Sequence, residues 1–271
     1  MKIAFIGGGN MATALIAGMA KDAGAGVQVH VVDRDPQALA RLAAQYGART
    51  AGAIDAAVAD AGVIVLAVKP QQMREVALEL APHLDGGPLV LSIAAGIRGA
   101  DLSRWLGGYG AIVRAMPNTP ALIGMGMTGL VALKGVSAAQ RAAADGVLRA
   151  VGQTVWLDDE ALIDPVTAVS GSGPAYVFYF LEAMQAAALE MGLSAQQGRE
   201  LALATFAGAT QLAAQSDEPL EVLRRRVTST GGTTHAAIAS MEAAGVKAAI
   251  VEAMKAAAAR GRALGDELGA D

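Results

Sequence analysis

Several features that mark particular classes of protein are missing from this sequence of 271 residues. Cysteine is absent, which excludes disulfides, thiolate nucleophiles and cysteine-based metal sites, and makes the reducing cytoplasm the expected location. The three histidines, His30, His83 and His235, show no metal-ligand spacing, so we expect no metal site. The formal net charge of -4 shows no basic excess, which argues against a nucleic-acid partner.

Uninterrupted apolar runs long enough to cross a membrane are also missing. The best candidate, residues 175–191, carries Glu182 and Glu190 and is typical of a buried helix in a soluble protein. The N-terminus begins like a signal peptide, but residues 7–10 interrupt its apolar run with three glycines and an asparagine. We therefore expect neither a membrane partner nor secretion.

The first 33 residues carry the pattern of a dinucleotide-binding βα unit. An apolar run at residues 2–6 is followed by G-x-G-x-x-A. In this motif Gly7 permits the tight bend, Gly9 the close approach of a pyrophosphate, and Ala12 close packing of a helix on the strand. A second strand then ends in Asp33, where a residue that binds the cofactor ribose is expected.

Asp33 and Arg34 leave the choice of cofactor open. A carboxylate accepts hydrogen bonds from the two ribose hydroxyls of NAD, whereas a guanidinium can pair with the 2′-phosphate of NADP. Both residues are therefore predicted to contact the cofactor, and the sequence does not decide between NADPH and NADH.

Three further strands are expected to end beside the same ligand. Residues 63–68 form a continuous apolar run, typical of a parallel strand buried on both faces, and residues 89–93 and 111–116 form the next two. In an open α/β sheet, ligands lie beyond the carboxyl ends of the strands. The predicted cofactor contacts from these strand ends are Ala67, Val68, Lys69, Pro70, Ala95 and Asn118.

Strands and helices alternate as far as residue 158, after which the pattern becomes wholly helical. The first part also predicts helices at 36–46, 53–59 and 137–150, and strands at 127–133 and 153–157. The second part predicts a helix at 159–169, broken by residues 170–173, and then helices at 175–191, 195–215, 220–227, 234–241 and 246–268. We therefore predict an α/β Rossmann-type domain at residues 1–158 and an all-α helical domain at 159–271.

The helices of the second domain are rich in alanine and carry apolar residues on more than one face. The chain is 54% hydrophobic but only 4% aromatic, which suits tight helix packing. Such helices need neighbours on several sides, more than a bundle of this length supplies. We therefore expect a homo-oligomer, at least a dimer.

Residues 227–235 interrupt these helices with five hydroxyl side chains and two glycines. Gly231 and Gly232 can adopt backbone conformations closed to other residues, so successive N–H groups can converge on a carboxylate just before the next helix. The alternative is a helix junction whose hydroxyl groups serve only as caps.

The chain closely resembles the pyrroline-5-carboxylate reductase family, whose members make L-proline in the last biosynthetic step. The matching stretches are residues 5–11, 67–70, 92–96, 116–120, 169–176 and 219–242, which occur in the family's order. The resemblance implies a Rossmann domain that prefers NADP(H), with Asn10 and Met11 among the cofactor contacts. It also implies a helical dimerisation domain, and an active site at the junction of the domains that the second subunit completes.

By the same resemblance, residues 229–234 form the substrate loop. Ser229 and the backbone N–H groups of Thr233 and Thr234 hold the substrate carboxylate, and Gly231 and Gly232 complete the loop. The Thr234 hydroxyl is placed to hydrogen-bond the ring nitrogen, which makes it the candidate catalytic group. Because protonation activates the C=N bond, no strong protein acid is obligatory, and orientation of the nicotinamide can supply most of the effect.

Two positions depart from the family pattern. The family usually has proline where this chain has Thr230, which implies a less rigid loop. It also often has an asparagine that contacts the cofactor ribose, where this chain has Ala53, Ile54 and Asp55.

Two other functions fit parts of the sequence. A β-hydroxyacid dehydrogenase shares the two-domain plan, but that chemistry needs a lysine base at the start of the long second-domain helix, and residues 171–180 contain no lysine. A non-catalytic module that binds NAD(P) and a partner protein leaves the hydroxyl-rich loop unexplained.

Overall fold

The computed structural model describes residues 1–21 and 26–270, which form two compact units. The first contains Met1–Ser172 together with Lys255–Asp271, and the second is Gly173–Met254. The chain thus leaves the first unit at Ser172 and returns to it through the last helix. The functional boundary between residues 158 and 159 stays a prediction.

In the described part of the first unit, eight strands form one sheet in the order β3-β2-β1-β4-β5-β6-β7-β8. Neighbouring strands are parallel except β6 and β7, which are antiparallel. The strands are β1 (Lys2–Ile6), β2 (Gln28–Val32), β3 (Arg49–Ala51), β4 (Val63–Leu66), β5 (Leu89–Ser92), β6 (Ile112–Met116), β7 (Gly126–Ala132) and β8 (Gly152–Trp156). The carboxyl ends of β1, β2 and β4 therefore lie at one edge of the sheet, as a Rossmann-type fold requires.

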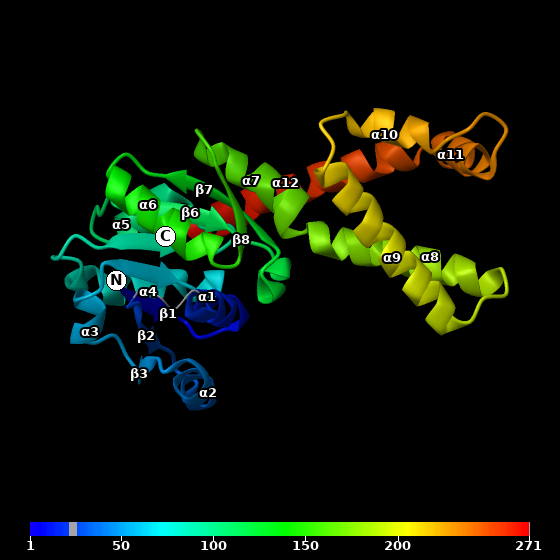
Figure 1. The fold of residues 1–271 in the computed structure, drawn as a ribbon. Coiled ribbons are helices and arrows are strands. Elements are labelled where there is room, and N and C mark those ends of the chain that lie inside the picture. The colour runs from blue at the N-terminus through cyan, green and yellow to red at the C-terminus, as the bar shows by residue number, and fades with distance from the viewer. Residues whose placement is uncertain (22–25, 271) are drawn as a thin grey trace. The chain divides into compact units, whose positions relative to one another are not determined.

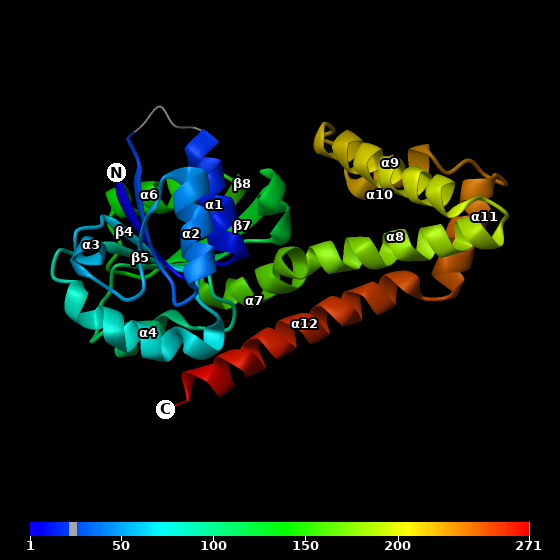
Figure 2. The same ribbon diagram turned by 90° about the horizontal axis from the view of Figure 1, so that it is seen from below.

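The sheet is buried on both faces because successive side chains of a strand point to opposite sides. In β1, Ile3 and Phe5 belong to one core cluster, whereas Ala4 and Ile6 belong to the other. The first cluster is covered by α1 (Asn10–Lys21), α2 (Pro36–Tyr46) and α6 (Ala138–Arg149), and the second by α3 (Ala56–Ala59), α4 (Met73–Leu80) and α5 (Gly99–Trp105). Figures 1 and 2 show the sheet with helices on both sides.

The end of the last helix, α12 (Val246–Gly269), packs on the second face of the sheet through Leu268. Gly261 and Gly265 are buried and one helical turn apart, so backbone lies close to the neighbouring side chains. A Cβ atom on Gly265 would lie 3.0 Å from Arg98 Nε. Arg98 in turn donates to Asp266 at 2.5 Å, which fastens the helix end to the first unit.

The second unit consists of α8 (Gly173–Glu190), α9 (Ala195–Ala214), α10 (Leu220–Arg226), α11 (Thr233–Ala243) and the first part of α12. Helices α8 and α9 pack on each other, and Gly198 permits the close approach because a Cβ there would lie 2.9 Å from the Ala188 Cβ. Ser194 and Gln197 form a capping box that begins α9.

Large apolar side chains of this unit remain exposed, as the helical pattern predicts. Tyr179 and Leu220 are each 73% exposed, and Leu212 is 60% exposed. Such a concentration of exposed apolar surface is typical of a protein interface. In the part of the chain that the structure describes, no helix is both long and apolar enough to cross a membrane.

The structure corrects two predicted elements. The helix predicted from residue 53 begins only at Ala56, because Asp55 caps it by accepting from the N–H groups of Ala57 and Val58. The predicted break at residues 170–173 is a π-helical turn, Thr167–Gly171, that leads into α8. The Ser172 N–H donates to the carbonyl of Thr167, five residues earlier, at 2.8 Å, and this spacing defines a π-helical turn.

Candidate functional site

The glycine turn between β1 and α1 has the shape of a phosphate cradle. Gly7 has a φ of +103°, and a Cβ there would lie 2.7 Å from the Ala67 carbonyl oxygen, so only glycine fits. A Cβ on Gly9 would meet no atom within 4 Å, which leaves room for a ligand to approach the backbone. The turn leads into α1 at Asn10, and a helix N-terminus favours a bound anion.

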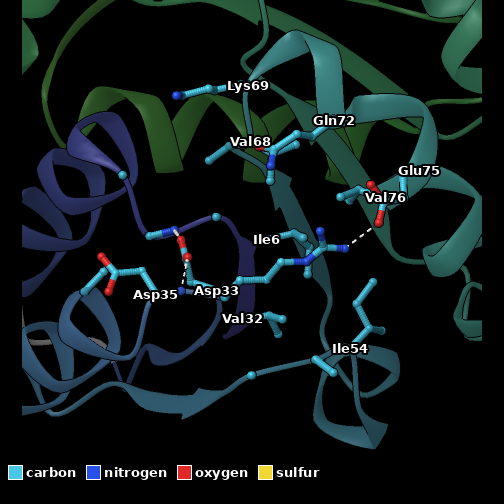
Figure 3. A pocket seen from close by; sticks show the side chains of 18 of the residues that line it. Ile6, Val32, Asp33, Asp35, Ile54, Val68, Lys69, Gln72, Glu75 and Val76 are labelled. Atoms are coloured by element: carbon cyan, nitrogen blue, oxygen red, sulfur yellow. Dashed lines mark hydrogen bonds and ion pairs between the residues drawn. The ribbon is translucent and has the colours of Figure 1, made fainter.

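A cavity of about 680 Å³ opens beside this turn within the first unit. Its size is typical of a cofactor site. It brings together eight of the predicted cofactor contacts, which are Gly7, Gly9, Asn10, Asp33, Arg34, Ala67, Val68 and Lys69. The open cradle and this donor set fit a dinucleotide. Figure 3 shows Asp33 at one side of the cavity and Val68 and Lys69 at another.

Asp33 is positioned by the backbone around it. Its Oδ2 accepts from the Gly8 N–H at 2.5 Å, and its Oδ1 accepts from the Asp35 N–H at 2.8 Å. Each carboxylate oxygen can still accept a second hydrogen bond. Asp33 can therefore receive ribose hydroxyls while it holds the glycine turn.

Arg34 is paired with a residue that the sequence did not indicate. Its Nη2 donates to Glu75 Oε1 on α4 at 2.5 Å, and the dashed line that ends at Glu75 in Figure 3 marks this pair. The hydrogen bond to Glu75, followed by the charge of that carboxylate, raises the pKa of Arg34. Sequence reasoning also missed Arg41, Gln72 and Glu79 in the cavity wall. The available signal for Gln72 and Glu79 was that they follow β4, whose end was already expected to border the cofactor, in the 3₁₀ turn Pro70–Gln72 and in α4. Arg41 lies on α2, which follows β2 and Arg34.

Four predicted cofactor contacts do not line this cavity. Met11 packs against the first core cluster, and Pro70 begins a 3₁₀ turn after Lys69. Ala95 lies beyond the end of β5. The side chain of Asn118 binds within the protein: Oδ1 accepts from the Met127 N–H at 2.9 Å, and Nδ2 donates to the backbone carbonyl and the hydroxyl oxygen of Ser170. The roles of these four residues toward the cofactor stay predictions.

The structure shows where the three residues lie that stand in place of the asparagine often found in the family. Ala53 and Ile54 line the cavity, but Asp55 does not. The Asp55 carboxylate caps α3 and lies 3.0 Å from His30 Nε2. The Asp55 carboxylate therefore binds groups of β2 and α3. It does not supply the ribose contact that the asparagine of the family makes.

In the second unit, the predicted substrate loop is built on a tight turn. The Gly232 N–H donates to the Ser229 carbonyl at 3.0 Å, and Gly231 has a φ of +76°. Thr230 therefore occupies the second position of the turn, where proline is favoured. The positive φ of Gly231 favours glycine at that position. A Cβ on Gly232 would lie 2.6 Å from Ser229 Oγ, so a larger residue there would have to displace the Ser229 side chain.

The loop ends at the N-terminus of α11, which has the properties of a carboxylate site. Gly232 precedes the helix, and no side chain caps it. The first N–H groups of a helix lack partners within the helix, so those of Thr233 and Thr234 can bind an anion. Arg224 donates to Glu242 at 2.9 Å, which ties α10 to α11 on the two sides of the loop.

Among the described residues, no group of three or more His, Asp or Glu side chains is placed to hold a metal ion. The cavity of the first unit and the loop of the second are the candidate binding features that the predicted site residues form.

Comparison with known proteins gives these features a family. Residues 160–264 match the family model described as pyrroline-5-carboxylate reductase dimerisation, and residues 2–96 match that described as NADP oxidoreductase coenzyme F420-dependent. The chain is 48% identical to pyrroline-5-carboxylate reductase of Pseudomonas aeruginosa, over 99% of this chain and 98% of that protein. The chain belongs to the pyrroline-5-carboxylate reductase family.

Solved structures of pyrroline-5-carboxylate reductases show the same fold. The one from Coxiella burnetii has a TM-score of 0.90 at 37% identity and covers 97% of each chain. The one from Plasmodium falciparum, solved with NADP bound, has a TM-score of 0.86 at 28% identity and covers 98% of each chain. Together with the glycine cradle, these matches identify a nicotinamide dinucleotide as the cofactor. They confirm the predicted α/β Rossmann-type domain followed by a helical dimerisation domain.

Proposed function

We propose that this protein reduces 1-pyrroline-5-carboxylate to L-proline by hydride transfer from NAD(P)H, the last step of proline biosynthesis. The observation that carries the proposal is the match to members of this family over nearly the whole chain. Within that length, the chain has both a dinucleotide cavity and a loop suited to a carboxylate.

The proposed roles follow from the geometry of each feature. In the first unit, the turn at Gly7 and Gly9 holds the pyrophosphate, and Asp33 accepts from the ribose. When bound, the reduced nicotinamide supplies the hydride. In the second unit, Ser229 and the N–H groups at the start of α11 hold the substrate carboxylate.

Thr234 is the proposed catalytic residue. It lies in the first turn of α11, beside the proposed carboxylate site. Its hydroxyl accepts a hydrogen bond from the iminium N–H and keeps the ring oriented, since the protonated C=N bond is already electrophilic. His235 has no role in this scheme.

For the cofactor, we propose that NADPH is preferred and NADH is accepted. Arg34 and Arg41 both line the cavity, and a guanidinium is the side chain best suited to bind a phosphate. Asp33 lies at the end of β2, where a carboxylate can serve the ribose of either dinucleotide.

We also propose a homodimer, or a larger assembly built on it, held by the second unit. The support is the exposed apolar surface of these helices and the family's dimerisation domain over residues 160–264. Sedimentation at micromolar concentration is expected to show no stable monomer. The absence of cysteine supports a cytoplasmic protein.

The test of the proposed function compares two substrates. NADPH consumption is expected with 1-pyrroline-5-carboxylate, and no NADH is expected to form from 3-hydroxyisobutyrate and NAD. The opposite pattern would favour a β-hydroxyacid dehydrogenase, whose lysine base has no counterpart at the start of α8. Binding of the dinucleotide without either reaction would favour a non-catalytic module.

A further inference from the structure

The Arg34–Glu75 pair joins two different walls of the cofactor cavity. Arg34 follows β2 and Glu75 lies on α4, and both line the cavity. The Arg34 Nη2 and Glu75 Oε1 atoms lie 2.5 Å apart, so the two charged groups are in direct hydrogen-bond contact. The guanidinium that would bind a 2′-phosphate is therefore already bound to a carboxylate of the protein.

Other charged side chains of the cavity wall lie around the Arg34–Glu75 pair. The cations in the cavity wall are Arg34, Arg41 and Lys69, and the anions are Asp33, Asp35, Glu75 and Glu79. Glu75 and Glu79 are four residues apart, so they lie on the same face of α4. Of these two, only Glu75 is hydrogen-bonded to Arg34, whereas Glu79 acts on it through charge alone.

We infer that Glu75 sets the degree of cofactor preference by competing with the 2′-phosphate for Arg34. This inference rests on the proposed function of the cavity. To bind NADP(H), Arg34 must release or share Glu75, and the phosphate must approach a second negative charge. NAD(H) has no 2′-phosphate, so it binds with the Arg34–Glu75 pair intact. Glu75 therefore weakens NADP(H) selectively and keeps NAD(H) usable.

A purely structural role does not explain the pair. The side chains of Arg34 and Glu75 are 66% and 62% exposed, and exposed ion pairs contribute little to stability. Removal of the Glu75 charge is therefore expected to leave the fold intact, which makes binding measurements on variants interpretable.

The test measures dissociation constants for NADP⁺ and NAD⁺ by isothermal titration calorimetry, without substrate. Glu75→Gln is expected to tighten NADP⁺ by up to about fivefold, the size of an exposed ion-pair interaction, and to change NAD⁺ by less. Glu79→Gln is the matched control, because it removes an equal charge from the same helix face without breaking a hydrogen bond to Arg34. Its effect on NADP⁺ is expected to be smaller.

A second pair of variants tests whether the effect passes through Arg34. In an Arg34→Ala background, Glu75→Gln is expected to lose most of its effect on the ratio of the two dissociation constants. The inference is overturned if Glu75→Gln and Glu79→Gln tighten NADP⁺ equally, if NAD⁺ tightens as much as NADP⁺, or if NADP⁺ weakens.

The same measurements distinguish a failure of the proposed function from a failure of this inference. If the unmodified protein binds both dinucleotides but does not reduce 1-pyrroline-5-carboxylate, the reaction is wrong and the binding constants still decide the role of Glu75. If it binds neither dinucleotide, the role of Glu75 is refuted as well.

Discussion

Thr230 is the residue of the predicted substrate loop at which this chain departs from the proline usual in the family. The structure puts it at the second position of the turn closed by Gly232 and Ser229, with Gly231 in the left-handed region. Proline has a fixed φ that suits this position of a turn. Threonine occupies the same backbone without that restriction, so it leaves the unfolded chain more freedom.

We expect Thr230→Pro to stabilise the protein by about 0.4–1 kcal/mol, because it reduces the entropy of the unfolded chain. Thermal unfolding measures the change. Thr228→Pro is the control, since the Thr228 N–H donates to the Arg225 carbonyl at 3.0 Å and proline would remove that bond. Equal destabilisation by both substitutions would show that the turn does not accept proline at residue 230.

Thr234 is the residue on which the proposed chemistry depends most. We expect Thr234→Ala to lower kcat/KM by roughly 5- to 30-fold, the equivalent of about 1–2 kcal/mol for a lost hydrogen bond. Thr234→Ser should restore most of the activity. Thr233→Ala is the matched control, because Thr233 acts through its backbone N–H in the proposed scheme. Equal steady-state kinetics for the Thr234→Ala and unmodified proteins would show that the hydroxyl has no role in turnover.

At the scale of elements, the packing around a helical glycine decides whether the better helix propensity of alanine can stabilise the protein. Gly18 in α1 and Gly146 in α6 are both interior helix positions. A Cβ on Gly18 would lie 2.4 Å from the Ala150 carbonyl oxygen, whereas one on Gly146 would meet no atom within 4 Å. The first clash is with backbone, which cannot move aside as a flexible side chain can.

Gly18→Ala is therefore expected to destabilise the protein by about 1–3 kcal/mol, despite its better helix propensity. Gly146→Ala is expected to stabilise it by about 0.5–1 kcal/mol, because the added methyl group only reduces backbone entropy. Urea unfolding of the two variants measures both changes. A stabilised Gly18→Ala protein would contradict the close packing of α1 on the end of α6.

Elements with a strong local pattern were predicted well, and those fixed by distant contacts were not. The continuous apolar run at Val63–Leu66 and the glycine turn after β1 are local signals, and the structure confirms both. Strand β3, Arg49–Ala51, has only three residues and no apolar alternation, so it depends on pairing with β2. The start of α3 depends on Asp55, a cap that the sequence pattern did not reveal.

The candidate site shows the same division. The predicted cofactor residues that reach the cavity belong to local motifs, each of which spans only a few positions of the sequence. The Arg34–Glu75 pair joins residues 41 positions apart, and the Asn118–Ser170 hydrogen bonds join residues 52 positions apart. No local pattern in one sequence encodes such pairs, so only the structure shows that Asn118 is bound within the protein.

At the scale of the whole molecule, the chain does not divide at a single point. Its helical half is continuous in sequence, yet α12 returns to the first unit, where Arg98 binds Asp266 across 168 positions. Composition and periodicity predicted the helix itself but not the unit in which its end is packed. The match to the family over nearly the whole chain means that both units contribute to one proposed function.

The measurement that tests the central claim most directly is a product analysis with the purified protein, 1-pyrroline-5-carboxylate and NADPH. The expected result is one L-proline formed for each NADPH oxidised, with no L-proline formed when the nicotinamide cofactor is omitted. NADPH oxidation without L-proline, or bound dinucleotide with no turnover, would contradict the proposed reaction.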